Sequence, residues 1–347
     1  MLAPSRQKHG AGTGVKRLVP PLLTLLIFVL IFRRIPFARF LEALAGADYA
    51  RFVLLMFPNG LFFFAWDTLI LTVVIRWLYA PLRFRDLLPV RAVSYVVSLM
   101  NTNLARATMA YYLTRQLRAP FFELAGTVLF LTLLEMTHLA LWASAGILAF
   151  HSQLPTGLLW VPLGLFLFWT GLLLSVRFDI APWRAVTTFI TAVFPRLHGR
   201  GSIREWAIFR PFVQLPLYRY GQVILLRAPL FFLSLVFHFL AVKTFGMDIP
   251  LLRMMTFLPI IFMLGALPIT VAHLGTTQAA WIFFFRDFAP APQLLAYSLA
   301  SHLAFMLARA TLGLVFLPRG YRVLFGALLP ERLPESARVL PLRTSTS

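Results

Sequence analysis

Residues 253–285 read RMMTFLPIIFMLGALPITVAHLGTTQAAWIFFF and decide the fold of this chain. The stretch is apolar at both ends, while Gly265, Pro268, His273 and Gly275 interrupt its middle. At bilayer depth such an interruption is tolerated only where the backbone is buried in protein or lines a watery cavity. We therefore expect two half-helices that form a hairpin and one wall of a substrate site. The alternative is a proline-kinked helix packed against its neighbours.

The composition of the whole chain is that of a membrane protein. Of its 347 residues, 60% are hydrophobic and 13% are charged, whereas soluble domains carry about 25% charged residues. The formal net charge is +20, and the basic residues lie mostly between the apolar runs, where cytoplasmic loops place them. We therefore expect a membrane lipid, and not a nucleic acid, as the partner. The absence of cysteine excludes disulfide and thiolate chemistry.

Six apolar runs are long enough to be expected to cross the membrane as helices. They cover residues 18–32, 52–75, 121–150, 158–176, 216–242 and 294–317. Residues 33–51 are expected to form a short interfacial helix. Residues 1–17 and 318–347 are polar and basic, and we expect both to be cytoplasmic tails of a protein of the bacterial inner membrane.

A second broken stretch lies within residues 90–118, where an apolar run stops at Asn101 and Asn103 and Arg106 follows. Basic residues flank both of its ends, which favours a re-entrant hairpin that enters and leaves on the cytoplasmic side. The chain then divides into residues 18–150, with this hairpin, and residues 151–317, with the hairpin 253–285. The expected fold is all-α and polytopic, with about six spans and two re-entrant hairpins in an inverted repeat.

Three segments at and after the two breaks are similar to one family. They read NTNLARATMAYYLTRQLRAPFFELAGTVLFLTLLE from residue 101, LPITVAHLGTTQAAW from residue 267 and LARATLGLVFLPR from residue 307. They resemble the flippase-like membrane domain of lysylphosphatidylglycerol synthases, in its stand-alone form without the synthetase domain. The residues that match in kind are Asn101, Asn103, Arg106, Pro268, Gly275, Arg309 and Gly313, while Gln278 stands near the Glu of the family pattern. The resemblance implies a lipid-translocating fold.

Polar residues at and after the breaks are the candidates for binding a lipid headgroup. Guanidinium groups match phosphate bidentately, and the N-termini of the half-helices add backbone donors for the same anion. The amides and hydroxyls either bind the headgroup or only satisfy backbone groups that the breaks leave free. The candidates are Asn101, Asn103, Arg106, His273, Thr276, Thr277, Gln278 and Arg309.

Four ionisable residues inside the apolar runs form a second group: Asp67, Glu135, His138 and Arg227. Charges at membrane depth are costly, so we expect a structural charge pair or a proton relay. Glu135 and His138 share one helical face, but a di-iron site needs a second motif of this kind, which the chain lacks. We expect no metal and no cofactor.

The function expected from these features is a lipid transporter that moves a phospholipid or polyprenyl-linked lipid between leaflets. One alternative is a polytopic lipid-linked glycosyl- or phospho-transferase with Glu42 or Asp48 as its base. The other is a membrane scaffold that holds a cytoplasmic partner enzyme through the Arg-rich residues 177–210. Since no catalytic motif is found, an enzyme is the less favoured class. A homo-oligomer is also compatible with the sequence.

Overall fold

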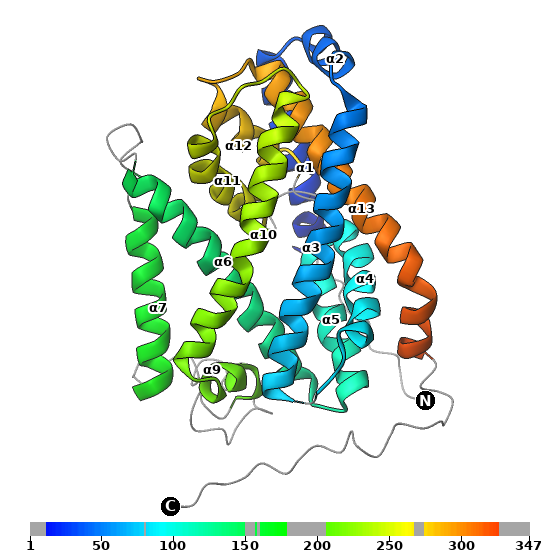
Figure 1. The fold of residues 1–347 in the computed structure, drawn as a ribbon, viewed down its shortest axis with the longest axis vertical. Coiled ribbons are helices and arrows are strands. Elements are labelled where there is room, and N and C mark those ends of the chain that lie inside the picture. Colours follow the sequence, from blue (N-terminus) through cyan, green and yellow to red (C-terminus); the bar gives the residue numbers. More distant parts are fainter. Residues whose placement is uncertain are drawn as a thin grey trace, which may run out of the picture.

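The computed structural model describes residues 12–79, 81–149, 157, 160–178, 206–266 and 274–325. These residues are almost entirely helical and contain no strand, which confirms the all-α expectation for this part of the chain (Figure 1). The elements are α1 (Gly12–Arg34), α2 (Phe37–Ala45), α3 (Tyr49–Leu78), α4 (Phe84–Met100), α5 (Thr102–Leu117), α6 (Phe121–Ala149), α7 (Trp160–Phe178), η5 (Ala207–Phe209), α9 (Arg210–Gln214), α10 (Leu217–Lys243), α11 (Leu251–Ala266), α12 (Thr276–Phe285) and α13 (Ala291–Phe325).

Four of the described helices are long and apolar enough to cross a membrane: α3, α6, α10 and α13. A fifth crossing results if the apolar part of α1 and the helix α2, which meet at 90°, count as one span. In α7 the apolar stretch among the described residues is shorter and covers Leu163–Leu172. The protein is therefore a helical membrane protein, and four of the six expected runs coincide with spanning helices. The crossings by residues 18–32 and 158–176 stay predictions.

Both broken stretches form pairs of packed helices. α4 and α5 are joined by the single residue Asn101 and pack against each other. α11 and α12 also pack against each other, and their connection, residues 267–273, lies outside the described residues. The α4–α5 hairpin lies toward the lower end of the molecule and the α11–α12 hairpin toward the upper end (Figure 1). The two pairs thus approach the middle of the bundle from opposite ends.

The first hairpin begins earlier than the charge pattern predicts. α4 starts at Phe84, before residue 90, where the sequence predicts the start of the hairpin. Asp86 explains this start, because its Oδ2 accepts a hydrogen bond of 3.0 Å from the backbone N–H of Arg83. An acidic side chain at this position satisfies a backbone donor that the helix leaves free. Arg91 therefore belongs to a helix and is not a loop residue.

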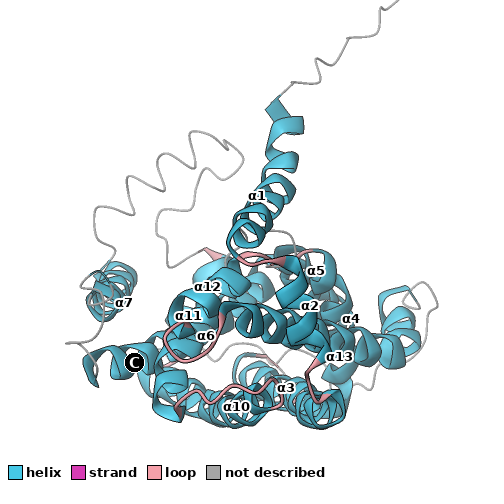
Figure 2. Cartoon of the chain, turned by 90° about the horizontal axis from the view of Figure 1, so that it is seen from above, coloured by secondary structure: helices cyan, strands magenta, loops and turns pink. Residues whose placement is uncertain are grey.

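The helices of the two hairpins pack against helices from the other half of the chain. α4 lies along α13, α11 lies along α6, and α3 packs against α10; Figure 2 shows α3 and α10 together on one side of the bundle. Glycines allow both hairpin contacts to be close. A Cβ on Gly146 of α6 would lie 2.7 Å from the Cα of Thr256 of α11, and a Cβ on Gly313 of α13 would collide with Val96 of α4.

The apolar core is divided into two large clusters along the length of the bundle. The upper cluster contains Phe52, Trp281 and Tyr297 and is built from the ends of α3, α6 and α10 together with α11, α12 and α13. The lower cluster contains Leu113 and Phe130 and joins α3, α4, α5, α6, α9 and α10. Polar side chains carried by these helices therefore meet between two apolar layers.

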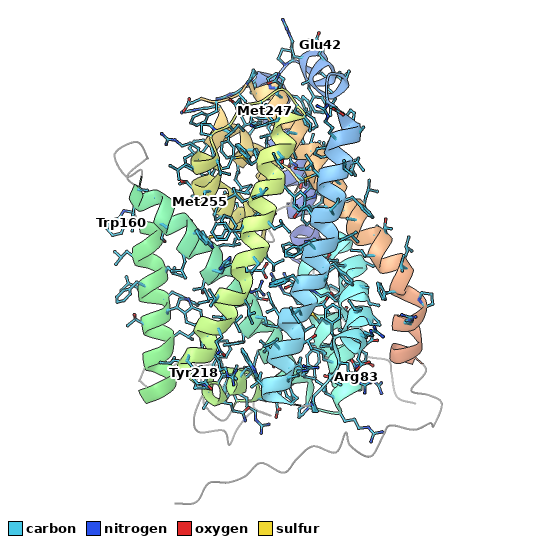
Figure 3. The ribbon with its side chains drawn as sticks, in the orientation of Figure 1. Glu42, Arg83, Trp160, Tyr218, Met247 and Met255 are labelled. Carbon is cyan, nitrogen blue, oxygen red and sulfur yellow. The ribbon has the colours of Figure 1, made fainter. Side chains whose placement is uncertain are left out.

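The two ends of the molecule are marked by polar residues. Glu42 on α2 lies at the upper end, while Arg83 and Tyr218 lie at the lower end (Figure 3). At the upper end Asp48 caps α3, since its Oδ1 accepts a hydrogen bond of 3.1 Å from the backbone N–H of Arg51. The short helix α2 thus occupies the region where the sequence predicts an interfacial helix.

Candidate functional site

A cavity of about 340 Å³ lies between the two apolar clusters. Its wall includes residues of both clusters: Leu71 and Leu131 of the lower cluster, and Ile261 and Trp281 of the upper cluster. The charged and titratable side chains of the wall come from α3, α4, α5, α6, α10 and α13. They are Asp67, Arg91, Tyr95, Arg106, Glu135, His138, Arg227, His238, His302 and Arg309.

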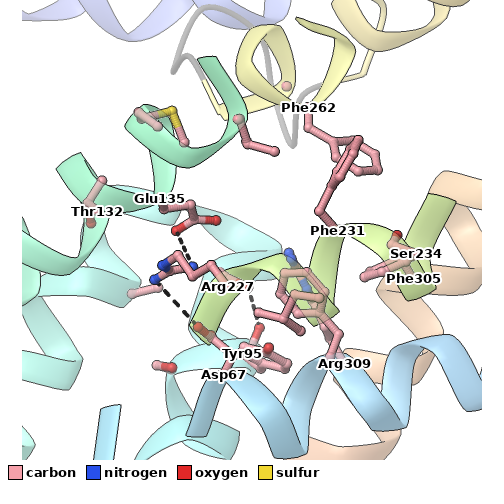
Figure 4. A pocket seen from close by; sticks show the side chains of 18 of the residues that line it. Asp67, Tyr95, Thr132, Glu135, Arg227, Phe231, Ser234, Phe262, Phe305 and Arg309 are labelled. Atoms are coloured by element: carbon pink, nitrogen blue, oxygen red, sulfur yellow. Dashed lines mark hydrogen bonds and ion pairs between the residues drawn. The ribbon is translucent and has the colours of Figure 1, made fainter. Parts of the chain in front are cut away.

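Four of these side chains form one chain of alternating charges. Arg91 pairs with Asp67, and Arg227 lies 3.8 Å from Asp67 and 3.8 Å from Glu135. Figure 4 shows Arg227 between the two carboxylates. Asp67 and Arg227 are almost completely buried, where an unpaired charge is costly. The expected charge pairing of Asp67, Glu135 and Arg227 is thus present in the structure, and Arg91 joins it.

Of the four residues in this charge network, Arg91 is the one that the sequence analysis did not predict. Its position among Arg76, Arg83 and Arg85 suggests a cytoplasmic loop residue. The signal that places it correctly is Asp86, which marks the start of a helix before Arg91. Once the helix begins at Phe84, Arg91 lies two turns inside it.

Arg309 and Arg106 line the same cavity without a carboxylate at ion-pair distance among the described residues. The guanidinium of Arg309 lies 5.2 Å from the ring centre of Tyr95 and 5.8 Å from that of Phe305. These rings hold the cation by cation–π attraction. Arg106 donates one hydrogen bond of 3.3 Å to the side-chain oxygen of Asn103. Both guanidinium groups therefore keep donors for an external anion.

Tyr95 contacts both an arginine that is paired with a carboxylate and one that, among the described residues, is not. Its ring lies 5.3 Å from the guanidinium of Arg91, which is paired with Asp67, and 5.2 Å from that of Arg309. The side chain is buried. Since Arg309 lies on α13 and Tyr95 on α4, this contact joins the first hairpin to the last span.

The amides of the first break support the backbone and do not line the cavity. Asn101 is exposed, and its side chain accepts hydrogen bonds of 2.8 and 3.0 Å from the backbone N–H groups of Asn103 and Leu104. It thereby caps α5. Asn103 is exposed as well and holds Arg106. Of the three candidates at this break, the structure places only Arg106 in the cavity wall.

Gln278 has a similar supporting role at the second break. Its Oε1 accepts a hydrogen bond of 2.6 Å from the backbone N–H of Gly275, which has a φ of +91° at the start of α12. Gln278 is fully buried and is not part of the cavity wall. Thr277 lines the cavity, and Thr276 is the first residue of α12. His273 lies outside the described residues.

Three histidines line the cavity. Glu135 and His138 lie on α6 and both contribute to the wall, as their spacing predicts. His238 and His302 are far apart in the sequence, and α10 and α13 bring them to the same cavity. The Nδ1 of His238 lies 2.6 Å from the hydroxyl of Tyr297. Within the described ranges no three His, Cys, Asp or Glu side chains come together in a way that would hold a metal ion.

The two acids proposed as a transferase base lie away from the cavity. Glu42 is at the upper end on α2, exposed, and 3.7 Å from Arg39. Asp48 is used as the cap of α3 and lies 3.2 Å from Arg51. Residues 179–205, which make up most of the proposed partner-binding loop, are outside the described part of the chain.

The cavity carries four arginines and two carboxylates among its described wall residues. At neutral pH the wall is therefore positive, and two of its arginines have no acidic partner there. Such a site is suited to binding an anion within the bundle. Compared with known protein families, with curated proteins and with solved structures, the chain matches none of them.

Proposed function

We propose that this protein moves the phosphate-bearing headgroup of a membrane lipid between the two leaflets. The observation that carries the proposal is a positive cavity between two apolar clusters, with Arg106 and Arg309 lacking carboxylate partners among the described residues. A positive group at membrane depth is costly. An arginine that is kept there without an acid partner is best explained by an anion that binds to it.

Phosphate is the anion that the cavity chemistry favours. A guanidinium presents parallel N–H donors that fit two phosphate oxygens. Arg106 and Arg309 come from α5 and α13, so a phosphate held by both would contact the first hairpin and the last span together. Thr277 adds a hydroxyl from the second hairpin.

The size of the cavity favours a headgroup with the lipid tails outside. Its volume of about 340 Å³ lies at the lower end of the range of roughly 300–1,000 Å³ that is typical of small-ligand sites. Two acyl chains in addition to a headgroup would exceed this space. The transport that we propose therefore passes only the polar group through the protein, while the tails remain in the bilayer.

We further propose that the two halves form an inverted repeat around this cavity. Reciprocal packing supports the idea: α4 lies along α13 while α11 lies along α6, and α3 packs against its counterpart α10. The close contacts are reciprocal too, because Gly313 and Gly146 sit where the opposite hairpin meets α13 and α6. Transporters with inverted repeats bind substrate at such a repeat interface, near the bilayer midplane.

The experiment that tests the function is a leaflet-resolved lipid scrambling assay in proteoliposomes. A fluorescent phosphatidylglycerol in the inner leaflet becomes accessible to a membrane-impermeant quencher only if it is moved outward. We expect scrambling by the wild type, and a large loss of rate in Arg106→Ala and Arg309→Ala. The matched control is Arg286→Ala, because Arg286 is exposed and does not line the cavity.

The melting temperature of each variant separates a loss of transport from a loss of fold. A folded Arg309→Ala variant that scrambles as fast as the wild type and the control would remove Arg309 from the mechanism. If the wild type moves none of phosphatidylglycerol, phosphatidylethanolamine or a polyprenyl phosphate, the proposed transport function is wrong.

A further inference from the structure

The two carboxylates of the cavity differ in their surroundings. Asp67 is enclosed, with 4% of its side chain exposed, and has an arginine on each side, Arg91 and Arg227. Glu135 has 35% of its side chain exposed, faces the cavity and is 3.8 Å from Arg227, which is its only ion-pair partner among the described residues. A proton that enters the cavity can therefore reach Glu135, while Asp67 is enclosed between its two arginines.

The carboxylate of Glu135 would repel the anion that the cavity would bind. Glu135, Arg106 and Arg309 line one small cavity, so a phosphate held there brings a second negative charge close to the carboxylate. Like charges at short range in a poorly hydrated site repel strongly. Protonation of Glu135 removes this repulsion. It also leaves Arg227 with Asp67 as its sole described carboxylate partner, so that the wall gains one net positive charge.

We infer that binding of a lipid phosphate in this cavity is coupled to the uptake of one proton by Glu135. The inference rests on the proposed lipid transport and names its coupling ion. The proton is transferred from a hydronium ion or a buffer acid of the solvent to the carboxylate of Glu135: the bond from the donor to this proton breaks, and the O–H bond of the neutral acid forms. This coupling is reciprocal. If protonation of Glu135 makes the anion bind more tightly, the bound anion makes the proton bind more tightly by the same factor.

Other charged or titratable groups face Glu135 from the helices around it. The cations are Arg91 on α4, Arg106 on α5, Arg227 on α10 and Arg309 on α13. The remaining ones are Asp67 on α3, Tyr95 on α4, His138 on α6 itself, His238 on α10 and His302 on α13. In the described parts of α11 and α12, the wall residues carry no titratable side chain. The three histidines are therefore the groups that an experiment must separate from Glu135.

The test is calorimetric titration of the purified protein with short-chain phosphatidylglycerol in pairs of buffers that differ in ionisation enthalpy. The difference in measured heat between the buffers counts the protons taken up. A phosphodiester does not titrate near neutral pH, so the groups that take up the protons belong to the protein. We expect uptake of about one proton per lipid bound, and an affinity that falls by about tenfold per pH unit over the range in which Glu135 is ionised in the free protein and protonated in the complex.

Variants of the acidic residues and histidines identify the residue that takes up the proton. Glu135→Gln is expected to bind the lipid with no proton uptake and with an affinity that does not change over the same pH range. Glu42→Gln removes an acid far from the cavity and should keep the wild-type coupling. His138→Gln, His238→Gln and His302→Gln should each keep it as well. Loss of proton uptake in a histidine variant, with uptake retained in Glu135→Gln, would overturn the assignment.

Inorganic phosphate and farnesyl phosphate serve as further probes. Both carry a phosphate group, but only farnesyl phosphate has an apolar tail. Tighter binding of the two lipids than of inorganic phosphate is the expected result, and equal binding of all three would contradict a lipid site. Binding of phosphatidylglycerol by the wild type without proton uptake overturns the coupling and leaves the transport proposal intact. Absence of both binding and scrambling defeats both proposals.

Discussion

The Nη2 atom of Arg227 lies 3.8 Å from the Oδ1 atom of Asp67. One belongs to α10 and the other to α3, two helices that are distant in the sequence and pack against each other. Arg91 pairs with the same carboxylate from α4. Asp67 is therefore the point at which a span of each half and the first hairpin are joined, and this contact leads to the first prediction.

Asp67→Asn is expected to destabilise the protein strongly. The change leaves Arg91 and Arg227 buried with less compensation, and loss of one partner of a buried ion pair costs about 3–5 kcal/mol. Thermal unfolding in detergent measures the effect. Asp248→Asn, at an exposed carboxylate, should have almost no effect. Adding Arg91→Gln to Asp67→Asn should recover part of the loss, and strictly additive losses would show that the pair is not coupled.

Gly146→Ala is expected to weaken the packing of α11 on α6. The added Cβ would lie 2.7 Å from the Cα of Thr256, so that the backbone of α11 must move. Overpacking of this kind costs about 1–3 kcal/mol. Gly164→Ala is the control: its Cβ would meet nothing within 4 Å, and alanine should raise helix stability by roughly 0.5–1 kcal/mol. Unfolding in detergent should move the two variants in opposite directions.

Gln278→Met is expected to destabilise the start of α12. Methionine has a similar shape but a poor acceptor, so the buried N–H of Gly275 loses its hydrogen bond. An unsatisfied buried donor costs about 1–3 kcal/mol. Gln278→Glu keeps the acceptor and places a negative charge at a helix N-terminus, where it is favoured. Because Gln278 is fully buried, the new charge also carries a desolvation cost. Thermal unfolding should therefore rank wild type above Gln278→Glu, and Gln278→Glu above Gln278→Met; an equal loss in both would contradict the capping role.

Cysteine accessibility tests which end of the molecule faces the cytoplasm. The chain has no cysteine of its own, so single substitutions give an unambiguous signal. Glu42→Cys at the upper end and Arg83→Cys at the lower end mark opposite ends of the bundle. We expect an impermeant thiol reagent to label Glu42→Cys in intact cells and Arg83→Cys only after permeabilisation. The reverse pattern would invert the proposed orientation.

The sequence by itself determined the class of the protein and the places where its helices break. Apolar runs predict spanning helices because a backbone in hydrocarbon must satisfy its own hydrogen bonds. Asn101 and Gly275 predict the ends of half-helices because one offers a capping side chain and the other tolerates a positive φ. Both properties depend on a few neighbouring residues, and the structure shows helix boundaries at both positions.

Tertiary structure decided which polar residues face the cavity. The sequence makes Asn101 and Gln278 candidates along with Arg106 and Arg309, but the side chains of Asn101 and Gln278 accept hydrogen bonds from the backbone beside them. His238, His302 and Arg91 reach the cavity only because α10, α13 and α4 meet there. Local sequence patterns indicate which residues are polar and where a helix ends. Which side chains share a cavity depends on the packing of helices that are distant in the chain, and one sequence does not reveal this packing.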